Sequence, residues 1–322
     1  MAEFTYDQSR IDALLVKAER VFQQSFLRAV RQIRDSVTLA ELESLLSQRR
    51  FEDALIQAEI AATNLSSAYV TAYVLAAEDV LKFLSDSIGI TVNFDQVNAR
   101  AVQEMREASL RLIQGFTSGQ RAATRQALVE GIRRGANPRD QARLFRESIG
   151  LTVGQSRAVA NFRRLLEQGS AEALTRDLRD ARFDTSIRRA VSGVRPLTSS
   201  QIDRQVQRYY ERSLVLRSQT IARTESLAAV HRGSDAAFRQ AIAAGLIDPD
   251  LSQTWHTAGD GRVRVPSHTF MNGQVRPFGV SFLSGTGNQL RYPGDSRAPA
   301  SDTVQCRCVK TTQFTADVVV PA

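Results

Sequence analysis

Apolar positions recur at helical spacing along most of the chain before Gly245. From about Gln8 to Ser36 they form a stripe on one face that no glycine or proline interrupts, which predicts a long amphipathic helix. A second long pattern runs from Phe51 to about Ser87. It is rich in alanine and serine, and small side chains favour close packing against a neighbouring helix. Further helical patterns cover residues 95–116, 120–134, 141–149, 153–168, 169–182 and 201–244.

Several short signals predict where these helices begin and end. Thr38-Leu-Ala-Glu41 matches a capping box, and Asn137-Pro138 matches a helix cap followed by a first-turn proline. Gly245 is typical of a helix C-terminus. The glycine, proline and serine residues of segment 192–200 indicate a linker.

The pattern changes after Gly245, where turn residues become dense and alternation replaces the helical period. Asn272-Gly273 is a strong signal for a tight turn, and it predicts a β-hairpin that pairs 266–271 with 274–279. The predicted fold is therefore mainly α, with a long helical N-terminal region followed by a small C-terminal α+β module with a β-hairpin. The predicted division is into residues 1–116, 117–195 and 200–322.

Charge is unevenly distributed along the chain. The formal net charge is +8, yet residues 1–100 carry a net −4 while residues 101–200, with 18 basic and 10 acidic residues, carry +8. Arginine's planar fork suits bidentate contacts with phosphate, so this bias favours a polyanionic partner, although a GC-rich genome would produce the same bias. The candidate DNA or phosphate contacts are Arg157, Arg163, Arg164, Arg176, Arg179, Arg188 and Arg189.

The first three of these arginines lie on the second of two short helices that have the length of a helix-turn-helix pair. Two helices joined by a glycine turn are also common as plain packing, and an arginine stripe is also typical of a solvated helix face. The chain has no apolar run long enough to span a bilayer and no secretory signal, which predicts a protein made in a reducing cytoplasm without a membrane partner.

Cysteine and histidine side chains converge in the predicted C-terminal module. A strand over 303–309 would place Cys306 and Cys308 on one face, and His268 from the predicted hairpin would complete three ligands for a structural zinc ion. His256 or Asp260 would supply the fourth. The alternative is that the two thiols are small buried side chains packed beneath Trp255.

The same residues could also be drawn as a catalytic site. A cysteine nucleophile with His268 as base, or a metal held by Asp260 and His268, would give a hydrolase or nuclease. No glycine-rich phosphate loop, G-x-S-x-G elbow or H-E-x-x-H motif supports such an enzyme. The expectation is therefore a protein that is not an enzyme, with a metal-dependent nuclease or hydrolase as the alternative.

The order of motifs resembles a known family. Ile221-Ala-Arg223-Thr-Glu225, Trp255, Asp260-x-Arg262-Val-Arg264, His268, Asn272-Gly273, Tyr292-Pro-Gly294 and Cys306-Arg-Cys308 follow one another as in the head-morphogenesis domain of phage minor head proteins, the phage Mu protein F-like family. The resemblance covers about 220–310. Gln305 stands where the family commonly has asparagine.

The resemblance implies a minor head protein of a tailed phage that is assembled in the host cytoplasm and lies inside the virion capsid near the portal. Its implied partners are the portal protein, the major capsid or scaffold protein, and DNA bound without sequence specificity. It implies roles in head assembly and in handling or delivering packaged DNA. The helical N-terminal region, which is acidic, would contact portal or capsid. The motif residues with implied structural roles are Arg223, Glu225, Trp255, Arg262, Arg264, Asn272 and Gly273.

Overall fold

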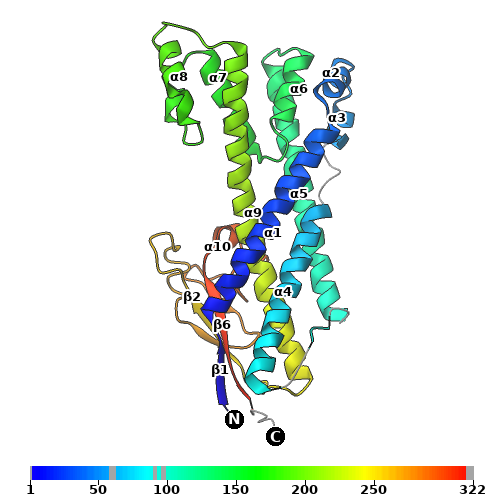
Figure 1. Ribbon diagram of the computed structural model, residues 1–322, viewed down its shortest axis with the longest axis vertical. Helices are drawn as coiled ribbons and strands as arrows, with labels where there is room; N and C mark the ends of the chain where they lie inside the picture. Colours follow the sequence, from blue (N-terminus) through cyan, green and yellow to red (C-terminus); the bar gives the residue numbers. More distant parts are fainter. Residues whose placement is uncertain (1, 58–62, 90–92, 96–98, 317–322) are drawn as a thin grey trace. The chain divides into compact units, whose positions relative to one another are not determined.

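The computed structural model describes residues 2–57, 63–89, 93–95 and 99–316. Its long helices precede a small C-terminal region with a few antiparallel strands, so the predicted mainly α fold class is confirmed (Figure 1). Contacts divide the chain into two compact units that are discontinuous in sequence. The predicted division into residues 1–116, 117–195 and 200–322 is continuous in sequence and does not correspond to these units, so it stays a prediction. Unit 1 comprises Met1–Ser25, Leu65–Arg111 and Gln219–Ala322, and unit 2 comprises Phe26–Asn64 and Leu112–Ser218.

Unit 1 combines helical segments with both small sheets. Its helices are the first part of α1 (Gln8–Ser36), most of α4 (Thr63–Ile88), the first part of α5 (Ala99–Arg133), the second part of α9 (Ser199–Ala243) and the short α10 (Ala300–Thr303).

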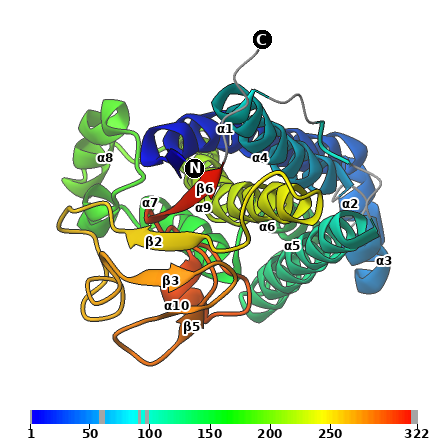
Figure 2. The ribbon, with the colours of Figure 1, turned by 90° about the horizontal axis from the view of Figure 1, so that it is seen from below.

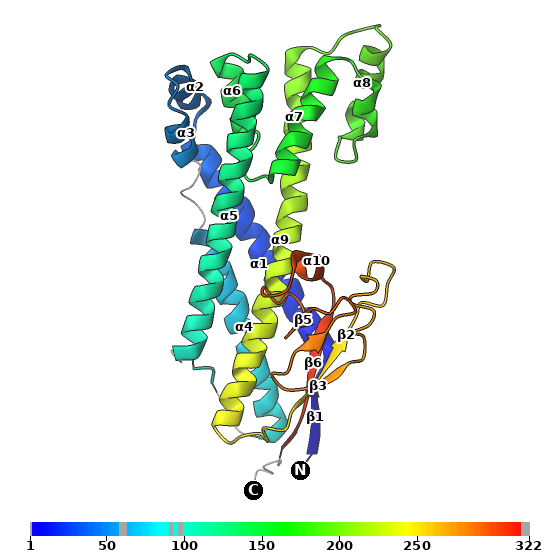
Figure 3. The ribbon, with the colours of Figure 1, turned by 180° about the vertical axis from the view of Figure 1, so that it is seen from behind.

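Helix α4 lies beside the C-terminal half of α9 (Figure 3). Gly233 of α9 permits their close approach, because a Cβ atom there would lie 2.1 Å from the carbonyl oxygen of Tyr73. The close packing predicted for the small-residue helix is therefore confirmed.

The larger sheet has the order β1-β6-β2-β3, and all its pairs are antiparallel (Figure 2). The sequence patterns did not predict β1, which pairs along its whole length with β6. Phe314 of β6 packs against Phe238 of α9 with ring centroids 6.0 Å apart, so the sheet shares an aromatic core with the helices. The strands are β1 (Ala2–Tyr6), β2 (Ser252–His256), β3 (Val275–Pro277) and β6 (Val309–Ala316).

The hairpin predicted at Asn272-Gly273 is wrong in its pairing. A turn does form there, since the Gln274 N–H donates to the Met271 carbonyl at 3.0 Å and Gly273 has φ +76°. Residues 266–271, however, form turns, and β3 pairs with β2 instead. The local turn signal was correct, but contacts with β2 decided which strands pair. The hairpin that exists joins β4 (Phe282–Leu283) to β5 (Gln289–Leu290).

Unit 2 is helical throughout the part that the structure describes. It contains the rest of α1, α5 and α9. Both predicted caps are confirmed, because the Thr38 hydroxyl accepts from the Glu41 N–H and the Asn137 side chain accepts from the Asp140 N–H. Its shorter helices are α2 (Leu39–Ser47), α3 (Phe51–Gln57), α6 (Pro138–Arg146), α7 (Val153–Glu167) and α8 (Asp184–Val191).

Two helix predictions in this region are wrong. Helix α5 continues through the predicted break at 117–119, because one glycine inside a helix costs only about 1 kcal/mol. The predicted helix over 169–182 is replaced by two short 3₁₀ segments, η1 (Ala171–Thr175) and η2 (Ala181–Phe183). Before each segment a polar side chain, Ser170 or Asp180, accepts a backbone N–H two residues ahead and starts a tight turn.

The helical pattern over 51–87 is found as α3 and α4, and residues 58–62 between them lie outside the described residues. The pattern over 95–116 is found within α5 from Ala99, and residues 96–98 likewise lie outside them. Among the helices that the structure describes, none is both long and apolar enough to cross a membrane.

Candidate metal centre

The cysteine loop, residues 304–308, joins α10 to β6 and is held to helix α9 by hydrogen bonds. The Arg223 Nε donates to the carbonyl oxygen of Cys306 at 3.2 Å. One residue further along α9, the Thr224 hydroxyl accepts from the Gln305 N–H at 3.0 Å. The Arg-Thr motif of the helix and the Cys-Arg-Cys motif of the loop, more than 80 residues apart in sequence, are therefore in direct contact.

The backbone at Gln305 turns through the left-handed region, with φ +55°. Non-glycine residues rarely adopt this conformation, and asparagine tolerates it better than glutamine does. The Gln305 side chain donates to the Thr220 hydroxyl at 2.6 Å, which helps to hold the turn. The strand predicted over 303–309 is consequently wrong, because the turn delays the start of β6 to Val309. Both thiols are nevertheless buried, as predicted.

His268 reaches the cysteines from a series of turns between β2 and β3. Its N–H donates to the Arg264 carbonyl at 2.9 Å, and its carbonyl accepts from the Met271 N–H at 3.0 Å. The preceding residue, Ser267, is buried and donates to the Asp302 carboxylate at 2.6 Å. These bonds hold the backbone on both sides of His268, so the ring position is fixed.

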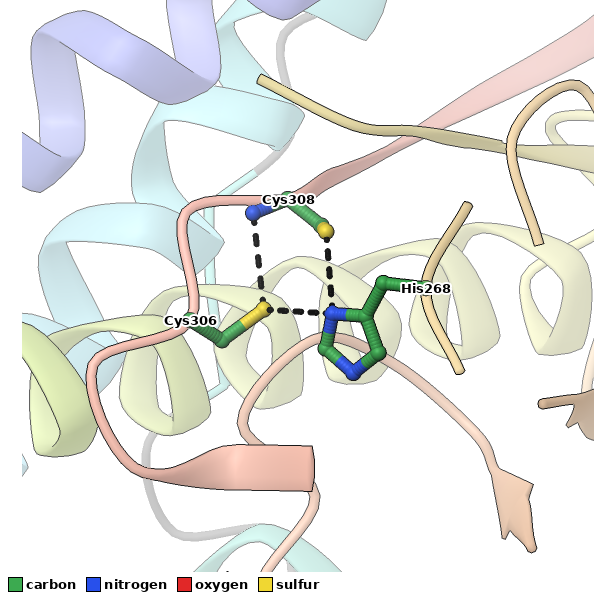
Figure 4. Close-up of side chains that lie close together, drawn as sticks. All are labelled: His268, Cys306 and Cys308. Carbon is green, nitrogen blue, oxygen red and sulfur yellow. Dashed lines mark hydrogen bonds between the residues drawn. The ribbon is translucent and has the colours of Figure 1, made fainter. Parts of the chain in front are cut away.

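The three side chains form a compact group (Figure 4). The Nδ1 atom of His268 lies 3.6 Å from the Cys306 Sγ and 3.3 Å from the Cys308 Sγ. The Cys308 N–H also donates to the Cys306 Sγ at 3.4 Å. The three potential ligand atoms all lie within 4.8 Å of one another, and each residue is at most 3% exposed. The group is buried and close enough to hold a metal ion.

The two sulfur–nitrogen distances are those expected for ligands of one tetrahedral zinc ion. Zinc binds sulfur at about 2.3 Å and histidine nitrogen at about 2.0 Å, which places a sulfur and a nitrogen on one ion roughly 3.5 Å apart. The observed separations of 3.3 and 3.6 Å bracket that value. Two thiolates and one imidazole also suit zinc chemically, because zinc accepts both sulfur and nitrogen ligands.

The two thiols differ in acidity. The hydrogen bond with Cys308 lowers the pKa of Cys306 well below its usual range, and His268 lowers it further although burial opposes both effects. The pKa of Cys308 is raised, first by its hydrogen bond to Cys306 and then by burial. Cys306 therefore ionises more readily than Cys308, and a metal bound by both sulfurs would displace any proton that they still carry.

A carboxylate lies behind the histidine ring. The Nε2 atom of His268 faces Asp302 with 3.9 Å between Nε2 and Oδ1, and both side chains are buried. Asp302 is itself held by Ser267 and by the Asn288 side chain, which donates at 2.7 Å. At this distance the pair is not hydrogen-bonded, and the His268 Nε2 has no hydrogen-bond partner among the described residues; a carboxylate that accepted this N–H would orient a metal-binding histidine and make it a better ligand. No sequence signal singled out Asp302, because its role depends on a contact across 34 residues.

The two side chains predicted as a fourth ligand have other partners. Asp260 forms a two-pronged ion pair with Arg307, which is the main cause of a pKa far below the usual range for that carboxyl. The His256 Nε2 shares a hydrogen bond with the Thr311 hydroxyl at 2.9 Å. Neither joins the metal-binding group among the described residues, so the structure does not bring the predicted fourth ligands, Asp260 and His256, to the other three. The group offers three protein ligands.

The other predicted motif residues lie around this centre. Trp255 is fully buried, and its ring meets the His268 ring edge-on with centroids 5.8 Å apart. The Gly273 N–H donates to the Trp255 carbonyl at 2.8 Å, and the Asn272 side chain accepts from the Thr257 N–H at 2.9 Å. These contacts hold the turn at 272–273 against β2.

Asp260, Arg262 and Arg264 alternate along the sequence, so an extended backbone would place them on one side, as an ion-pair ladder or an anion site. The backbone turns at 260–262 instead. Arg262 pairs with Asp260 at 3.5 Å, while Arg264 donates to the carbonyl oxygen of Val304. Arg264 thus holds the start of the cysteine loop.

Most of the predicted phosphate-binding arginines have partners within unit 2. Arg163 is only 9% exposed and bridges Glu147 at 2.5 Å and Asp203 at 2.8 Å. The helix pair α6–α7 exists as predicted, but this buried network makes Arg163 a structural residue that DNA does not reach. Exposed Arg189 has no such partner among the described residues. The remaining contacts join Arg157 to Gln126, Arg164 to Asn161 and Gln168, Arg176 to Glu172, and Arg179 and Arg188 to Asp184.

Comparison of the chain with protein-family models, with curated proteins and with solved structures finds no match.

Proposed function

We propose that the chain is a minor head protein of a tailed phage, related to the phage Mu protein F-like family. The contact between Arg223 of α9 and the carbonyl oxygen of Cys306 carries the proposal. It joins the first and last motifs of the resemblance in one site, as expected if the ordered motifs are parts of a single module. The proposed setting is the capsid interior near the portal, with roles in head assembly and in handling or delivering packaged DNA.

The proposed role of the metal centre is structural. A zinc ion held by His268, Cys306 and Cys308 would join the turns before β3 to the start of β6, two segments that are distant in sequence. Burial of all three residues and the carboxylate of Asp302 behind the ring support this role. On this proposal the ion stabilises the module, and the protein is not an enzyme.

A metal-dependent hydrolase or nuclease is the alternative. Three protein ligands leave one position open, as in catalytic zinc sites. Beside His268 and Cys308 lies a small cavity of about 10 Å³, lined also by Arg262, Arg264 and Arg307. That volume is close to the minimum needed for a single water molecule, so it suits a fourth water ligand better than a substrate.

The test of the proposed function is association with the portal. The full chain would be expressed with and without the portal protein of the same phage, and assembled heads would be purified. We expect the chain to co-purify with the portal and to be present in the heads. Failure to associate with the portal, the major capsid protein or the scaffold protein would contradict the proposal.

Variants of the metal centre distinguish a structural metal from a catalytic one. Substituting Asp302→Asn leaves the three ligands in place and weakens the support of His268. On the structural proposal, this change lowers thermal stability and head incorporation together. Hydrolysis of DNA or protein by the wild-type chain that is lost when the three ligands are replaced would favour the enzyme.

A further inference from the structure

We propose that a pocket in unit 2, between α8 and the start of α9, binds a phosphate group. The pocket has a volume of about 290 Å³. Four arginines, a buried glutamine and one aromatic ring contribute to its walls. These residues, here called the arginine pocket, are Arg182, Phe183, Arg189, Arg195, Arg204 and Gln205.

Three of the four arginines are free to bind a ligand. Arg189, Arg195 and Arg204 are exposed, and within the part of the chain that the structure describes none has a carboxylate within 4.0 Å. An arginine without a carboxylate partner keeps its full set of guanidinium donors for another anion. Three such groups around one cavity match the oxygens of a phosphate, which arginine binds through paired hydrogen bonds.

Three acidic residues of this region already form ion pairs with arginine. Asp180 pairs with Arg182 at 2.6 Å, and Asp184 pairs with Arg179 at 3.0 Å. Asp203, next to Arg204 in sequence, pairs with Arg163 at 2.8 Å. These ion pairs neutralise the three carboxylates, so the arginine pocket keeps an excess of positive charge.

Gln205 gives an independent sign of a ligand. It is 3% exposed and lines the pocket, yet its Oε1 atom has no hydrogen-bond partner among the described residues. An unsatisfied buried polar atom costs about 1–3 kcal/mol, so a partner is expected. The side-chain amide can present either its oxygen or its NH₂ group after a half turn, so it can accept from a nucleotide or donate to a phosphate oxygen.

The start of α9 adds to the positive field. Leu197, two residues before this helix, and Gln201, in its first turn, line the same pocket. Thr198 caps the helix, since its hydroxyl accepts from the Gln201 N–H. The remaining first-turn amides and the helix dipole favour an anion nearby.

The size of the pocket limits the ligand. A volume near 290 Å³ is at the lower end of the range for small-molecule sites, roughly 300–1,000 Å³, and is too small for a folded partner. It suits one phosphate with part of a nucleotide, and Phe183 offers a ring on which a base could stack. The phosphate could come from a DNA strand or from a free nucleotide. The choice of DNA rests on the proposed function, whereas the phosphate chemistry does not.

The test uses the full-length chain and two probes. Anisotropy of a labelled DNA duplex would be measured across a salt series, and binding of a deoxynucleoside triphosphate would be measured by calorimetry. The variant is Arg189→Ala with Arg195→Ala and Arg204→Ala. The matched control replaces three other exposed arginines of unit 2, Arg28, Arg133 and Arg139, by alanine, so both variants lose the same charge.

We expect the pocket variant to bind DNA at least tenfold more weakly than wild type and the control variant to lose less than threefold. The slope of log affinity against log salt should fall by about 0.9 in the pocket variant, the change expected for one lost phosphate contact. Loss of triphosphate binding alone would retain the phosphate site and assign its ligand as a free nucleotide. Equal losses in the two variants for both probes would overturn the proposal.

The result of these binding experiments is independent of the result of the portal test. A chain that associates with the portal, but whose two variants lose DNA and triphosphate binding equally, would retain the proposed function and reject the pocket. Gln205→Glu gives a second check, because a carboxylate in the pocket should repel phosphate. We expect it to weaken binding of whichever probe binds wild type, with thermal unfolding measured to show that the variant is folded.

Discussion

The metal-binding group of unit 1 and the arginine pocket of unit 2 differ in how their polar and charged side chains are buried and paired. Around His268 the polar atoms are buried, and Ser267, Asp302 and Asn288 hydrogen-bond to one another. In the arginine pocket, three guanidinium groups are exposed and lack acidic partners among the described residues. Buried groups that hydrogen-bond to one another help to specify one arrangement of the chain, although the His268 Nε2 has no hydrogen-bond partner among the described residues, whereas unpaired exposed cations are available to a ligand. The residues around His268 are therefore expected to stabilise the fold, and the exposed arginines of the pocket are expected to bind a ligand.

The largest expected effect is loss of the metal. Substituting Cys306→Ala together with Cys308→Ala should lower the free energy of unfolding by at least about 4 kcal/mol, a fraction of the roughly 10–16 kcal/mol that zinc contributes to small zinc-finger peptides. Thermal unfolding should show a drop of roughly 10 °C. A chelator should lower the wild-type transition by a similar amount and leave the variant unchanged. A wild-type protein that is insensitive to chelation would contradict a structural metal.

The next effect is the difference in stability between replacing a buried arginine and replacing an exposed one. Arg163→Ala leaves Glu147 buried without its partner, so we expect a loss of about 3–5 kcal/mol in unfolding free energy. Arg157→Ala, which loses only a contact with Gln126, should change stability by less than about 0.5 kcal/mol. Denaturant unfolding measures both. Equal stability of the two variants would show that the buried network has no structural role.

A smaller effect depends on pH. Burial raises the pKa of Glu225 to about 7, well above its ordinary value of 4.5. Between these values the folded chain holds a proton that the unfolded chain has lost, so stability falls as pH rises from about 4.5 through 7. Glu225→Gln removes this dependence. Because part of Glu225 is exposed, we expect a gain of about 2 kcal/mol at pH 8 and almost none at pH 4.5.

Thermal or denaturant unfolding of both chains across that pH range checks this prediction. Comparing the difference between variant and wild type cancels contributions from other titrating groups. A difference that does not grow with pH would mean that the carboxyl is not desolvated in the folded chain.

The smallest effect concerns the turn before Cys306. Gln305 has φ +55°, so Gln305→Asn should stabilise the chain by roughly 0.5 kcal/mol through better tolerance of the left-handed conformation, although it loses the hydrogen bond to Thr220. Gln313→Asn in the extended strand β6 is the control and should give no gain. A loss of stability in Gln305→Asn would show that the Thr220 bond outweighs the backbone term.

Local patterns in the sequence predicted what local forces decide. Most of the helical patterns, the caps at Thr38 and Asn137 and the turn at Asn272-Gly273 depend on neighbouring residues and are present, whereas the helix predicted over 169–182 is not. The group of His268 and two cysteines was also predicted, because the chain has few histidines and cysteines and most of them lie in its C-terminal part.

Contacts between distant segments were not predictable in the same way. Strand β1 is recognised only through its pairing with β6, about 300 residues away, and Asp302 only through its position behind His268. Charge alone did not distinguish Arg163 from Arg189, although one is in a buried network and the other faces a pocket. Which cations are free depends on where the chain places its carboxylates.

The most direct test of the proposed metal centre is the metal content of the intact chain, measured by native mass spectrometry after purification under reducing conditions. The proposed metal centre predicts a single zinc ion per wild-type chain and none when His268 or the two cysteines are replaced by alanine. A wild-type chain that carries no metal and binds none when zinc is added would contradict it.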